Sequence, residues 1–464
     1  MNSDLSWKQI SDLVHKAIKN LRKNAVQADA FFMSTQTAEV TIRNSEILTQ
    51  NRTDDSGVGF RAVAEGNKVG FASTNDLGEK AVFHTAERAL STAKVSSSVP
   101  NFALPEAGKP AEVSGLFFSE VAEVSIQQIV DFARRAINAA ESFDKRVIAK
   151  SGRIFFQYGW RGVENTRGVD FEEKESRVMF YLDGVGEKGE QVTGSCFELG
   201  LSRNSDLNPE AIGKSVGKMV TEMFDPKPLK SFQGTVIFGP QAVSYQICDV
   251  LIDALKGENI LAGRSAWTRK IGQDVTSRHL SLEDNAVLDG GFSSRGFDDE
   301  GCPSCKTTLI KNGELRSHLH IASTADALNV SNTGNASRFA SNFEMVHMIV
   351  GNGYRTKPEV YPSNLFIKPG NKSKDELVSE TQEGVLVESM AGFAQPGSGN
   401  ISAQLSRAFY IRDGEILHPI RGGLVSGNAF DWLKKVSEVG NDAKAFMNAV
   451  VPSLKVENVK IIGG

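Results

Sequence analysis

Two cysteines and two histidines are the residues of this sequence best suited to bind a metal ion. Cys302 and Cys305 form a Cys-Pro-Ser-Cys motif, and His318 and His320 follow with one residue between them. Zinc prefers thiolate and imidazole ligands, and residues two apart on a strand share a face, so these four side chains form one candidate metal site. Thiol exchange is less favoured, because reactive pairs sit at helix starts and Lys306–Ile310 is typical of a strand. The interpretation we favour is that both thiols are ordinary strand and turn residues, with the metal site as the alternative.

A run of small and polar residues, Ser331–Arg338, is a candidate contact site. Glycine and asparagine allow a close backbone approach and positive φ angles, and an arginine can pair with a peptide carbonyl or carboxylate. We therefore predict that Asn332, Asn335 and Arg338 contact a peptide or a partner chain. The alternative is a structural loop that closes its domain.

Two further groups contain possible metal ligands but also have simpler explanations. Cys248, Asp249 and Asp253 lie on a predicted helix, Gln241–Leu255, and would form an altered metal site. Cysteine is also a common small apolar core residue, which is the interpretation we favour here. The acidic turn Asp298–Gly301 would suit a cation, although such a turn before a strand needs no ligand to explain it.

The length and composition of the chain limit its class. At 464 residues it exceeds the roughly 250–300 residues of one core, so two or three domains are expected. A net charge of −4 makes nucleic-acid binding unlikely as a function. No apolar run reaches the roughly 20 residues that span a membrane, and no secretory signal is expected. Four scattered cysteines do not suit a disulfide framework and favour a cytoplasmic protein with reduced thiols.

Residues 1–225 are predicted to form an α+β region of α/β layers, possibly divided into two subdomains. The periodicity of apolar residues predicts helices at Ser6–Leu21, Asp76–Ala93, Ser125–Phe143 and Pro209–Met223. Alternation predicts strands at Ala30–Ile47, Val58–Ala64, Lys68–Ser73, Val147–Tyr158, Arg177–Val185 and Glu190–Arg203, with a break at Thr53–Gly57. A proline-containing stretch at about 95–112 is predicted to be a surface strap.

Residues 226–464 are predicted to form an antiparallel, β-rich domain with a barrel-like or sandwich arrangement. Asp225–Pro228 marks the boundary, because prolines there end the preceding helix. Short apolar runs separated by glycine, asparagine and aspartate turns follow from Thr276 to Gly422, among them Glu344–Val350.

Several blocks, in order along the chain, resemble the TldD/PmbA family. They are Gly57–Leu77, Gly291–Arg338, Asp413–Ile420, Leu424–Asn428 and Val439–Asp442. The first contains a Gly-Val-Gly-x-Arg strand followed by Gly-x-x-Gly-Phe-Ala, and the second contains the acidic turn and the Asn/Gly/Arg run. No single block is specific alone, but together they cover most of the chain.

The resemblance implies a chemical division within the family. Catalytic members carry His-Glu-x-x-x-His on the helix after the domain boundary and a cysteine near the C-terminus, which together bind zinc. Three protein ligands and an open position allow zinc to activate water. Here the corresponding helix, Gln241–Leu255, contains no histidine, and the segment after Val439 contains no cysteine. The chain therefore resembles the PmbA branch, also called TldE-like.

The resemblance implies a non-catalytic, peptide-binding and structural subunit of a metallopeptidase complex that acts on unfolded peptides. We expect no catalytic residue and no cofactor in this chain, with zinc only in a TldD-like catalytic partner. The pairing would be a heterodimer with that paralogue, or a homodimer. The alternative is a self-sufficient metallopeptidase with a divergent site at Cys302, Cys305, His318 and His320. DNA binding, suggested by the family's older gyrase-modulator label, has no support in the charge balance.

Overall fold

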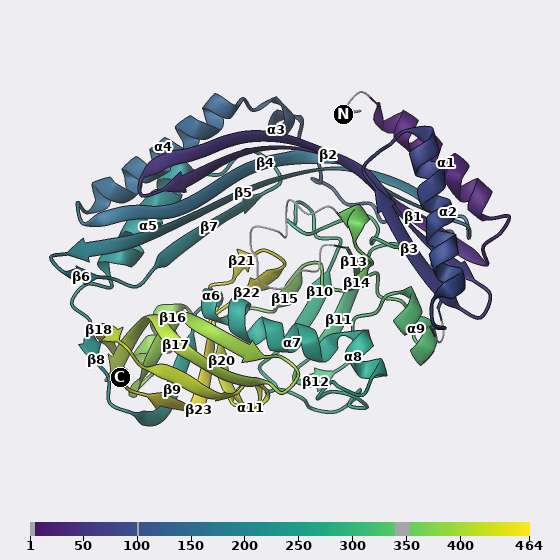
Figure 1. Ribbon diagram of the computed structural model, residues 1–464. Helices are drawn as coiled ribbons and strands as arrows, with labels where there is room; N and C mark the ends of the chain where they lie inside the picture. Colours follow the sequence, from purple (N-terminus) through teal and green to yellow (C-terminus); the bar gives the residue numbers. More distant parts are fainter. Residues whose placement is uncertain (1–4, 100–101, 339–352) are drawn as a thin grey trace.

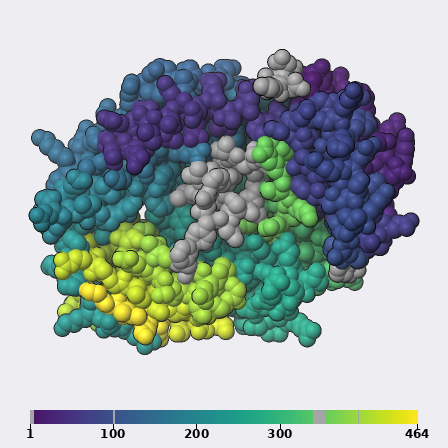
Figure 2. Space-filling view, viewed as in Figure 1, coloured from purple at the N-terminus to yellow at the C-terminus, as the bar shows by residue number. Residues whose placement is uncertain are grey.

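The computed structural model describes residues 5–99, 102–338 and 353–464, and its two parts lie one above the other. An arched N-terminal sheet with helices on its outer side covers a C-terminal part built mainly of strands (Figure 1). The space-filling view shows the same division, with purple and blue N-terminal residues above green and yellow C-terminal ones (Figure 2). The predicted α+β class is confirmed. Within the described ranges, no helix is long and apolar enough to cross a membrane.

The N-terminal sheet is antiparallel, with the strand order β3-β2-β1-β4-β5. Its strands are β1 (Gln27–Arg43), β2 (Glu46–Ala64), β3 (Lys68–Thr74), β4 (Val147–Asn165), β5 (Asp170–Lys188), β6 (Gln191–Val192) and β7 (Cys196–Ser202), and the last two both pair with β5. Its helices are α1 (Trp7–Leu21), α2 (Glu79–Val95), α3 (Ser119–Glu123), α4 (Ile126–Phe143) and α5 (Pro209–Thr221). Helices α1 and α2 cover one end of the sheet, and α4 and α5 cover the other.

The two faces of this sheet have different partners because side chains alternate along a strand. Even-numbered residues such as Phe32 of β1 and Phe180 of β5 pack against the helices. Odd-numbered residues such as Phe31 of β1 and Phe155 of β4 pack toward the C-terminal part, in clusters that include Phe297 and Phe446. Each long strand therefore supplies both the helical layer and the interface between the two parts.

The predicted break at Thr53–Gly57 is wrong. Strand β2 runs through it, and this segment pairs with β1 from Thr37↔Thr53 to Met33↔Gly57. The chain reverses earlier, at Asn44 and Ser45, whose φ angles are 47° and 64°. Polar side chains do not interrupt a strand whose backbone is fully paired. The polarity of these residues was therefore a misleading signal for the end of the strand.

The two glycines of the Gly-Val-Gly signature make room for Tyr354. A Cβ atom on Gly57 would lie 2.3 Å from the Tyr354 ring, and one on Gly59 would lie 2.1 Å from the Tyr354 carbonyl oxygen. The Tyr354 hydroxyl donates a hydrogen bond to Asp55 Oδ1 at 2.9 Å. The two glycines of this sequence signature therefore allow the N-terminal sheet to contact a segment that is distant in the chain.

The C-terminal part contains a small barrel and a second sheet. Strands β16, β9, β23, β19 and β17 form the barrel, which closes because β16 also pairs with β17. Its strands and their extensions are β8 (Lys227–Pro228), β9 (Phe232–Phe238), β16 (Glu383–Gln395), β17 (Asn400–Arg412), β18 (Glu415–Arg421), β19 (Leu424–Asn428), β20 (Val436–Val439) and β23 (Leu454–Ile462). The second sheet has the order β12-β11-β10-β15-β22-β21.

The remaining elements complete this part. They are β10 (Leu282–Asn285), β11 (Lys306–Lys311), β12 (Glu314–Leu315), β13 (Ala336–Ser337), β14 (Glu359–Val360), β15 (Leu365–Ile367), β21 (Lys444–Phe446), β22 (Ala449–Val451), α8 (Gly257–Leu261), α9 (Ala322–Leu328), η2 (Gly353–Arg355), α10 (Lys374–Ser379) and α11 (Ala429–Lys434). The predicted strand Glu344–Val350 lies outside the described residues.

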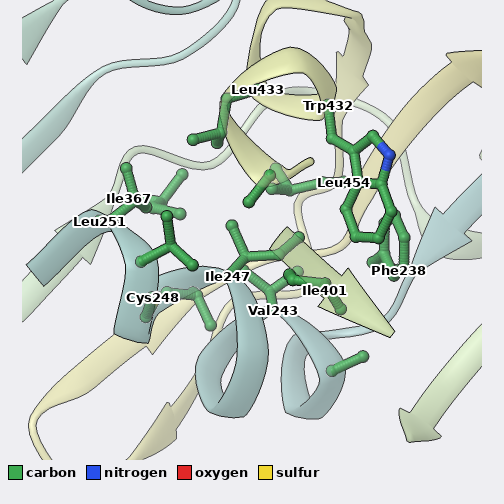
Figure 3. Packing of buried hydrophobic residues seen from close by; sticks show 14 of the residues in the cluster. Phe238, Val243, Ile247, Cys248, Leu251, Ile367, Ile401, Trp432, Leu433 and Leu454 are labelled. Atoms are coloured by element: carbon green, nitrogen blue, oxygen red, sulfur yellow. The ribbon is translucent and has the colours of Figure 1, made fainter. Parts of the chain in front are cut away.

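A helix between these two sheets occupies the position predicted for it. It begins with α6 (Pro240–Ala242), continues as a π-helical turn, η1 (Val243–Ile247), and ends with α7 (Cys248–Leu255). Proline suits the first helical position, where no intrahelical N–H bond is lost. Figure 3 shows side chains of this helix packed against Phe238 of β9, Trp432 of α11 and other buried residues of the C-terminal part. Single π-helical turns often mark functional sites in helices.

Candidate functional site

The first candidate site is the helix that would carry the zinc ligands in a catalytic relative. Cys248, Asp249 and Asp253 have the spacing of His-Glu-x-x-x-His. Cys248 is only 1% exposed and belongs to the apolar core (Figure 3). Burial, with a smaller effect of Asp249, raises the pKa of this thiol, and burial raises that of Asp249 to about 6. Burial therefore disfavours the anionic forms of Cys248 and Asp249, which are the forms that bind a metal ion.

The Cys-Pro-Ser-Cys motif and the two histidines do not form one metal-binding cluster. Cys305 Sγ is exposed and contacts the carbonyl oxygen of Thr333 at 3.5 Å, while both histidines are buried. The two imidazole rings are perpendicular, with centroids 6.2 Å apart. Among the residues that the structure describes, no three His, Cys, Asp or Glu side chains could hold a common metal ion. The thiols and imidazoles of this group therefore do not fit the ligand set that zinc requires.

The acidic turn Asp298–Gly301 is the centre of an interdomain network of charges. Arg61 of β2 donates to both carboxylate oxygens of Asp29 at 2.9 and 2.8 Å, and to Glu300 Oε1 at 2.7 Å. Arg161 of β4 donates to Asp299 Oδ1 at 2.8 Å. All of these side chains are at least nine-tenths buried, and the arginines supply the positive charge that a cation would otherwise provide. The turn therefore connects the arched sheet to the C-terminal part.

Asp298 differs from Asp299 and Glu300 because, among the described residues, backbone N–H groups rather than arginine side chains donate its hydrogen bonds. Its carboxylate accepts hydrogen bonds from the amides of Glu300, Cys302 and Ala336. Burial and the adjacent Glu300 carboxylate raise the pKa of Asp298 to about 7. These bonds fix the turn and the start of the Cys-Pro-Ser-Cys motif against the Ala336 backbone.

The three residues predicted to contact a peptide or partner lie on a loop against this turn. Asn335 is fully buried and donates to Asp284 Oδ2 at 2.6 Å. Arg338 is 2% exposed, with its amide bonded to Asp299 and its guanidinium bonded to Asp29. Asn332 is half-buried, and its side chain accepts from the Gly334 amide. Each thus has a structural role, and their contact with a peptide or partner stays a prediction.

A cavity lies beside the network, where the odd-numbered residues of β4 and β5 meet the C-terminal part. Its volume is about 80 Å³, and its lining is Arg161, Glu175, Arg177, Phe292, Ser293, Arg295, Asp299, Ser337, Tyr361, Pro362, Ser363, Met447 and Asn448. The sequence does not predict this group of arginines, because Arg161 and Arg177 of the N-terminal sheet meet Arg295 only through tertiary packing. The available signal was the charged run from Glu172 to Arg177, but it has charges at both even and odd positions and so does not assign them to one face of the sheet.

Two sheet edges also lie close together near this cavity. Strand β7 pairs only with β5, and β21 pairs only with β22, among the described residues. Lys444 of β21 forms an ion pair with Glu198 of β7. Around them, Tyr245 of the π-helical turn packs edge-on against Phe197 and Phe446. Unpaired strand edges are able to bind an extended peptide through main-chain hydrogen bonds.

Family models match nearly the whole chain. The PmbA/TldA metallopeptidase domain 1 matches residues 28–93, the central domain matches 119–224, and the C-terminal domain matches 231–463. The chain belongs to the PmbA/TldD family. The family resemblance seen in the sequence is therefore confirmed.

Individual members of the PmbA/TldD family are similar along their full lengths. An uncharacterized protein of Methanocaldococcus jannaschii is 25% identical, and the match covers 95% of this chain and 98% of the relative. Metalloprotease PmbA of Escherichia coli O157:H7 is 24% identical over 98% and 96% of the two chains. The crystal structure of TldE from Thermococcus kodakarensis has a TM-score of 0.88 and 25% identity, covering 97% of this chain and 100% of that one.

Proposed function

We propose that this chain is the non-catalytic, peptide-binding subunit of a TldD/TldE-type metallopeptidase complex that acts on unfolded peptides. The main observation is the helix α6–η1–α7, where Cys248, Asp249 and Asp253 have the spacing of the zinc motif but include no histidine. Cys248 packs in the apolar core instead. In this proposal zinc is bound by a partner chain that carries His-Glu-x-x-x-His, and this chain needs no cofactor.

The two strand edges of β7 and β21 support a role in holding peptide. The edges of β7 and β21 lie next to the cavity region, and main-chain bonding at such edges accepts many sequences. Similarity to a protein named TldE and to proteins named metalloprotease is consistent with a two-chain enzyme in the cytoplasm. A heterodimer is the form we propose, and a homodimer is the alternative arrangement.

A reconstitution experiment tests this proposal. The chain and a TldD-type paralogue from the same genome are purified separately and assayed on an unfolded protein such as reduced casein. We expect hydrolysis only after mixing, with a stable complex in size-exclusion chromatography and about one zinc per complex. Each chain is also assayed alone with added zinc as the control.

The opposite result would identify the alternative function. If the chain alone binds one equivalent of zinc and hydrolyses casein, it is a self-sufficient metallopeptidase. Cys302→Ser and His318→Gln variants would then show whether the metal depends on the divergent candidate site. Unchanged zinc content in both variants would place the metal elsewhere.

A further inference from the structure

The interdomain cavity has an unusual surplus of arginine. Arg161, Arg177 and Arg295 line it, whereas only two carboxylates, Glu175 and Asp299, do so. Its volume of about 80 Å³ exceeds the roughly 10–15 Å³ that one water molecule requires. The cavity is therefore large enough for a carboxylate group, but not for a whole peptide.

Each of the two carboxylates is shared between arginines. Asp299 Oδ1 accepts from Arg161 at 2.8 Å and lies 3.7 Å from Arg295 Nη1. Glu175 Oε2 accepts from Arg177 at 2.9 Å and lies 3.5 Å from Nη1 of the buried Arg203. Among the described residues, the carboxylates nearest to Arg295 and Arg203 are therefore already hydrogen-bonded to another arginine.

Arg295 has incomplete hydrogen bonding among the described residues. The residue is 8% exposed, its Nη2 makes only a long contact of 3.4 Å with the Gly334 carbonyl, and its Nε has no partner within the described residues. The Nε atom of Arg177, on the same cavity, is also buried and has no partner there. A buried charged donor without an acceptor is costly, so an anionic acceptor would be stabilising.

Burial is the main influence on Arg203, beside the cavity. Burial, followed by the charge of Arg177, lowers the pKa of Arg203 to about 10, and the influence of Glu175 does not compensate. Carboxylates also surround these arginines, since Glu173 Oε1 accepts a hydrogen bond from Arg161 at 2.9 Å. The guanidinium groups around the cavity are therefore poorly solvated, which favours an additional hydrogen-bond acceptor.

We propose that this cavity binds a carboxylate group of the peptide, with the guanidinium groups of Arg295 and Arg177 as hydrogen-bond donors. The carboxylate is either the peptide's C-terminus or an aspartate or glutamate side chain. Arginine suits this ligand because its planar fork of donors matches both oxygens. The inference rests on the proposed function insofar as the ligand is a peptide, and it adds a preferred charge to that peptide.

The binding test uses the full-length chain and three rhodamine-labelled octapeptides without other acidic residues. One has a free C-terminal carboxylate, one has a C-terminal amide, and one is amidated but contains a single internal glutamate. Fluorescence anisotropy gives the dissociation constants. We expect the amide to bind about tenfold more weakly than the free acid, the effect of losing one charge-assisted interaction.

Substitutions connect this preference to the cavity. Arg295→Gln and, separately, Arg177→Gln should reduce affinity for the acid to that for the amide, while Arg295→Lys keeps part of the preference. Arg134→Gln is the matched control, since Arg134 lies on α4 with a side chain 61% exposed. Circular dichroism melts confirm that each variant is folded. If one variant fails to fold, the other provides the test.

The outcomes are distinct. Equal affinity for the three peptides, or no binding of any peptide, would overturn the inference. A preference that both glutamine variants retain would also overturn it. Tight binding of the glutamate peptide alone would assign the cavity to a side-chain carboxylate. Mass spectrometry of the peptides after binding tests the proposed function separately. Cleavage by this chain alone would refute a non-catalytic role, but the preference for a carboxylate could still be measured.

Discussion

The helix α6–η1–α7 and the acidic turn Asp298–Gly301 are both buried in the C-terminal part, yet their side chains differ in kind. The helix places Cys248 among apolar residues, whereas the turn places Asp299 and Glu300 against arginines of the N-terminal sheet. Helix packing is largely apolar and tolerates loss of a ligand set, because a thiol fills the space of a small hydrophobic residue. The turn has no such freedom, because the buried carboxylates of Asp299 and Glu300 each pair with an arginine of the N-terminal sheet.

The two regions therefore differ in what their buried polar positions do. Asp299 and Glu300 are charged and paired with arginines across the two parts, while Cys248, at the first position of the zinc-motif spacing, is part of the apolar core. This contrast is consistent with the proposed function, in which the chemistry belongs to another chain. The following predictions test each side of the contrast, beginning with the largest effect.

Removing Arg61 should cause the greatest loss of stability. Arg61→Ala leaves the buried carboxylates of Asp29 and Glu300 without their main donor. We expect the free energy of unfolding to fall by about 3–5 kcal/mol, as for other broken buried ion pairs. Urea denaturation followed by circular dichroism measures it. Arg135→Ala, which removes the exposed pair with Glu210, is the control and should leave the denaturation midpoint nearly unchanged.

In the helix α6–η1–α7, by contrast, Cys248 should behave as a core residue. Cys248→Ser introduces a hydroxyl into an apolar environment, and we expect the free energy of unfolding to fall by about 1–3 kcal/mol. Cys248→Ala adds no polar group and should cost less. Zinc analysis of the wild-type protein and the alanine variant is the decisive comparison. Stoichiometric zinc in the first and none in the second would show that Cys248 is a ligand.

The stability contributed by His320 should depend on pH. Burial and the adjacent His318 lower the pKa of His320 to about 4, while a histidine in an unfolded chain titrates near 6.5. The unfolded chain therefore takes up the proton first, so this contribution is complete above about pH 6.5 and declines as the pH falls toward 4. Between pH 6.5 and 5.5 the wild-type protein should lose about 1 kcal/mol more than His320→Gln.

Urea titrations at several pH values measure this difference in slope. His279→Gln is the matched control, because His279 is exposed, and it should follow the wild-type curve. Parallel curves for wild type and His320→Gln would contradict the prediction. The comparison of slopes avoids any constant effect of losing the contact between His320 Nδ1 and Thr324.

The smallest effect is expected at Cys305. This residue is exposed, and its thiol forms weak contacts with the Thr333 carbonyl oxygen and the Thr307 hydroxyl. Cys305→Ser should change the free energy of unfolding by less than about 0.5 kcal/mol. The same urea titrations measure it. A loss as large as that of Cys248→Ser would mean that the Cys-Pro-Ser-Cys motif has a role beyond an ordinary turn.

Helix predictions succeeded where one apolar face was buried. The predicted helix Ser125–Phe143 corresponds to α4, and Gln241–Leu255 corresponds to α6–η1–α7. Strand limits were less accurate, because pairing with β1 continues β2 through the polar residues from Thr53 to Gly57. Long-range pairing of this kind has no local sequence signal.

The site was harder to predict than the fold. Arg61, Arg161 and Arg295 are far apart in the sequence, and only the packing of the sheet on the Asp298–Gly301 turn brings them together. The absence of histidine from Gln241–Leu255 was readable directly, because a local motif needs no tertiary information. The same reasoning overvalued His318 and His320: the strand predicted to carry them ends earlier, with β12 at Glu314–Leu315, and both histidines are buried in the segment that follows.

The alternation of side chains along the arched sheet has an evolutionary consequence. Odd-numbered residues of β4 and β5 form the floor of the interdomain cavity, while the even-numbered ones hold the helices. Point substitutions at odd positions of these strands would therefore alter the cavity while leaving the face that packs against the helices unchanged. A one-residue insertion in either strand would instead exchange the two sets of side chains, so it would disturb the helical layer and the cavity together.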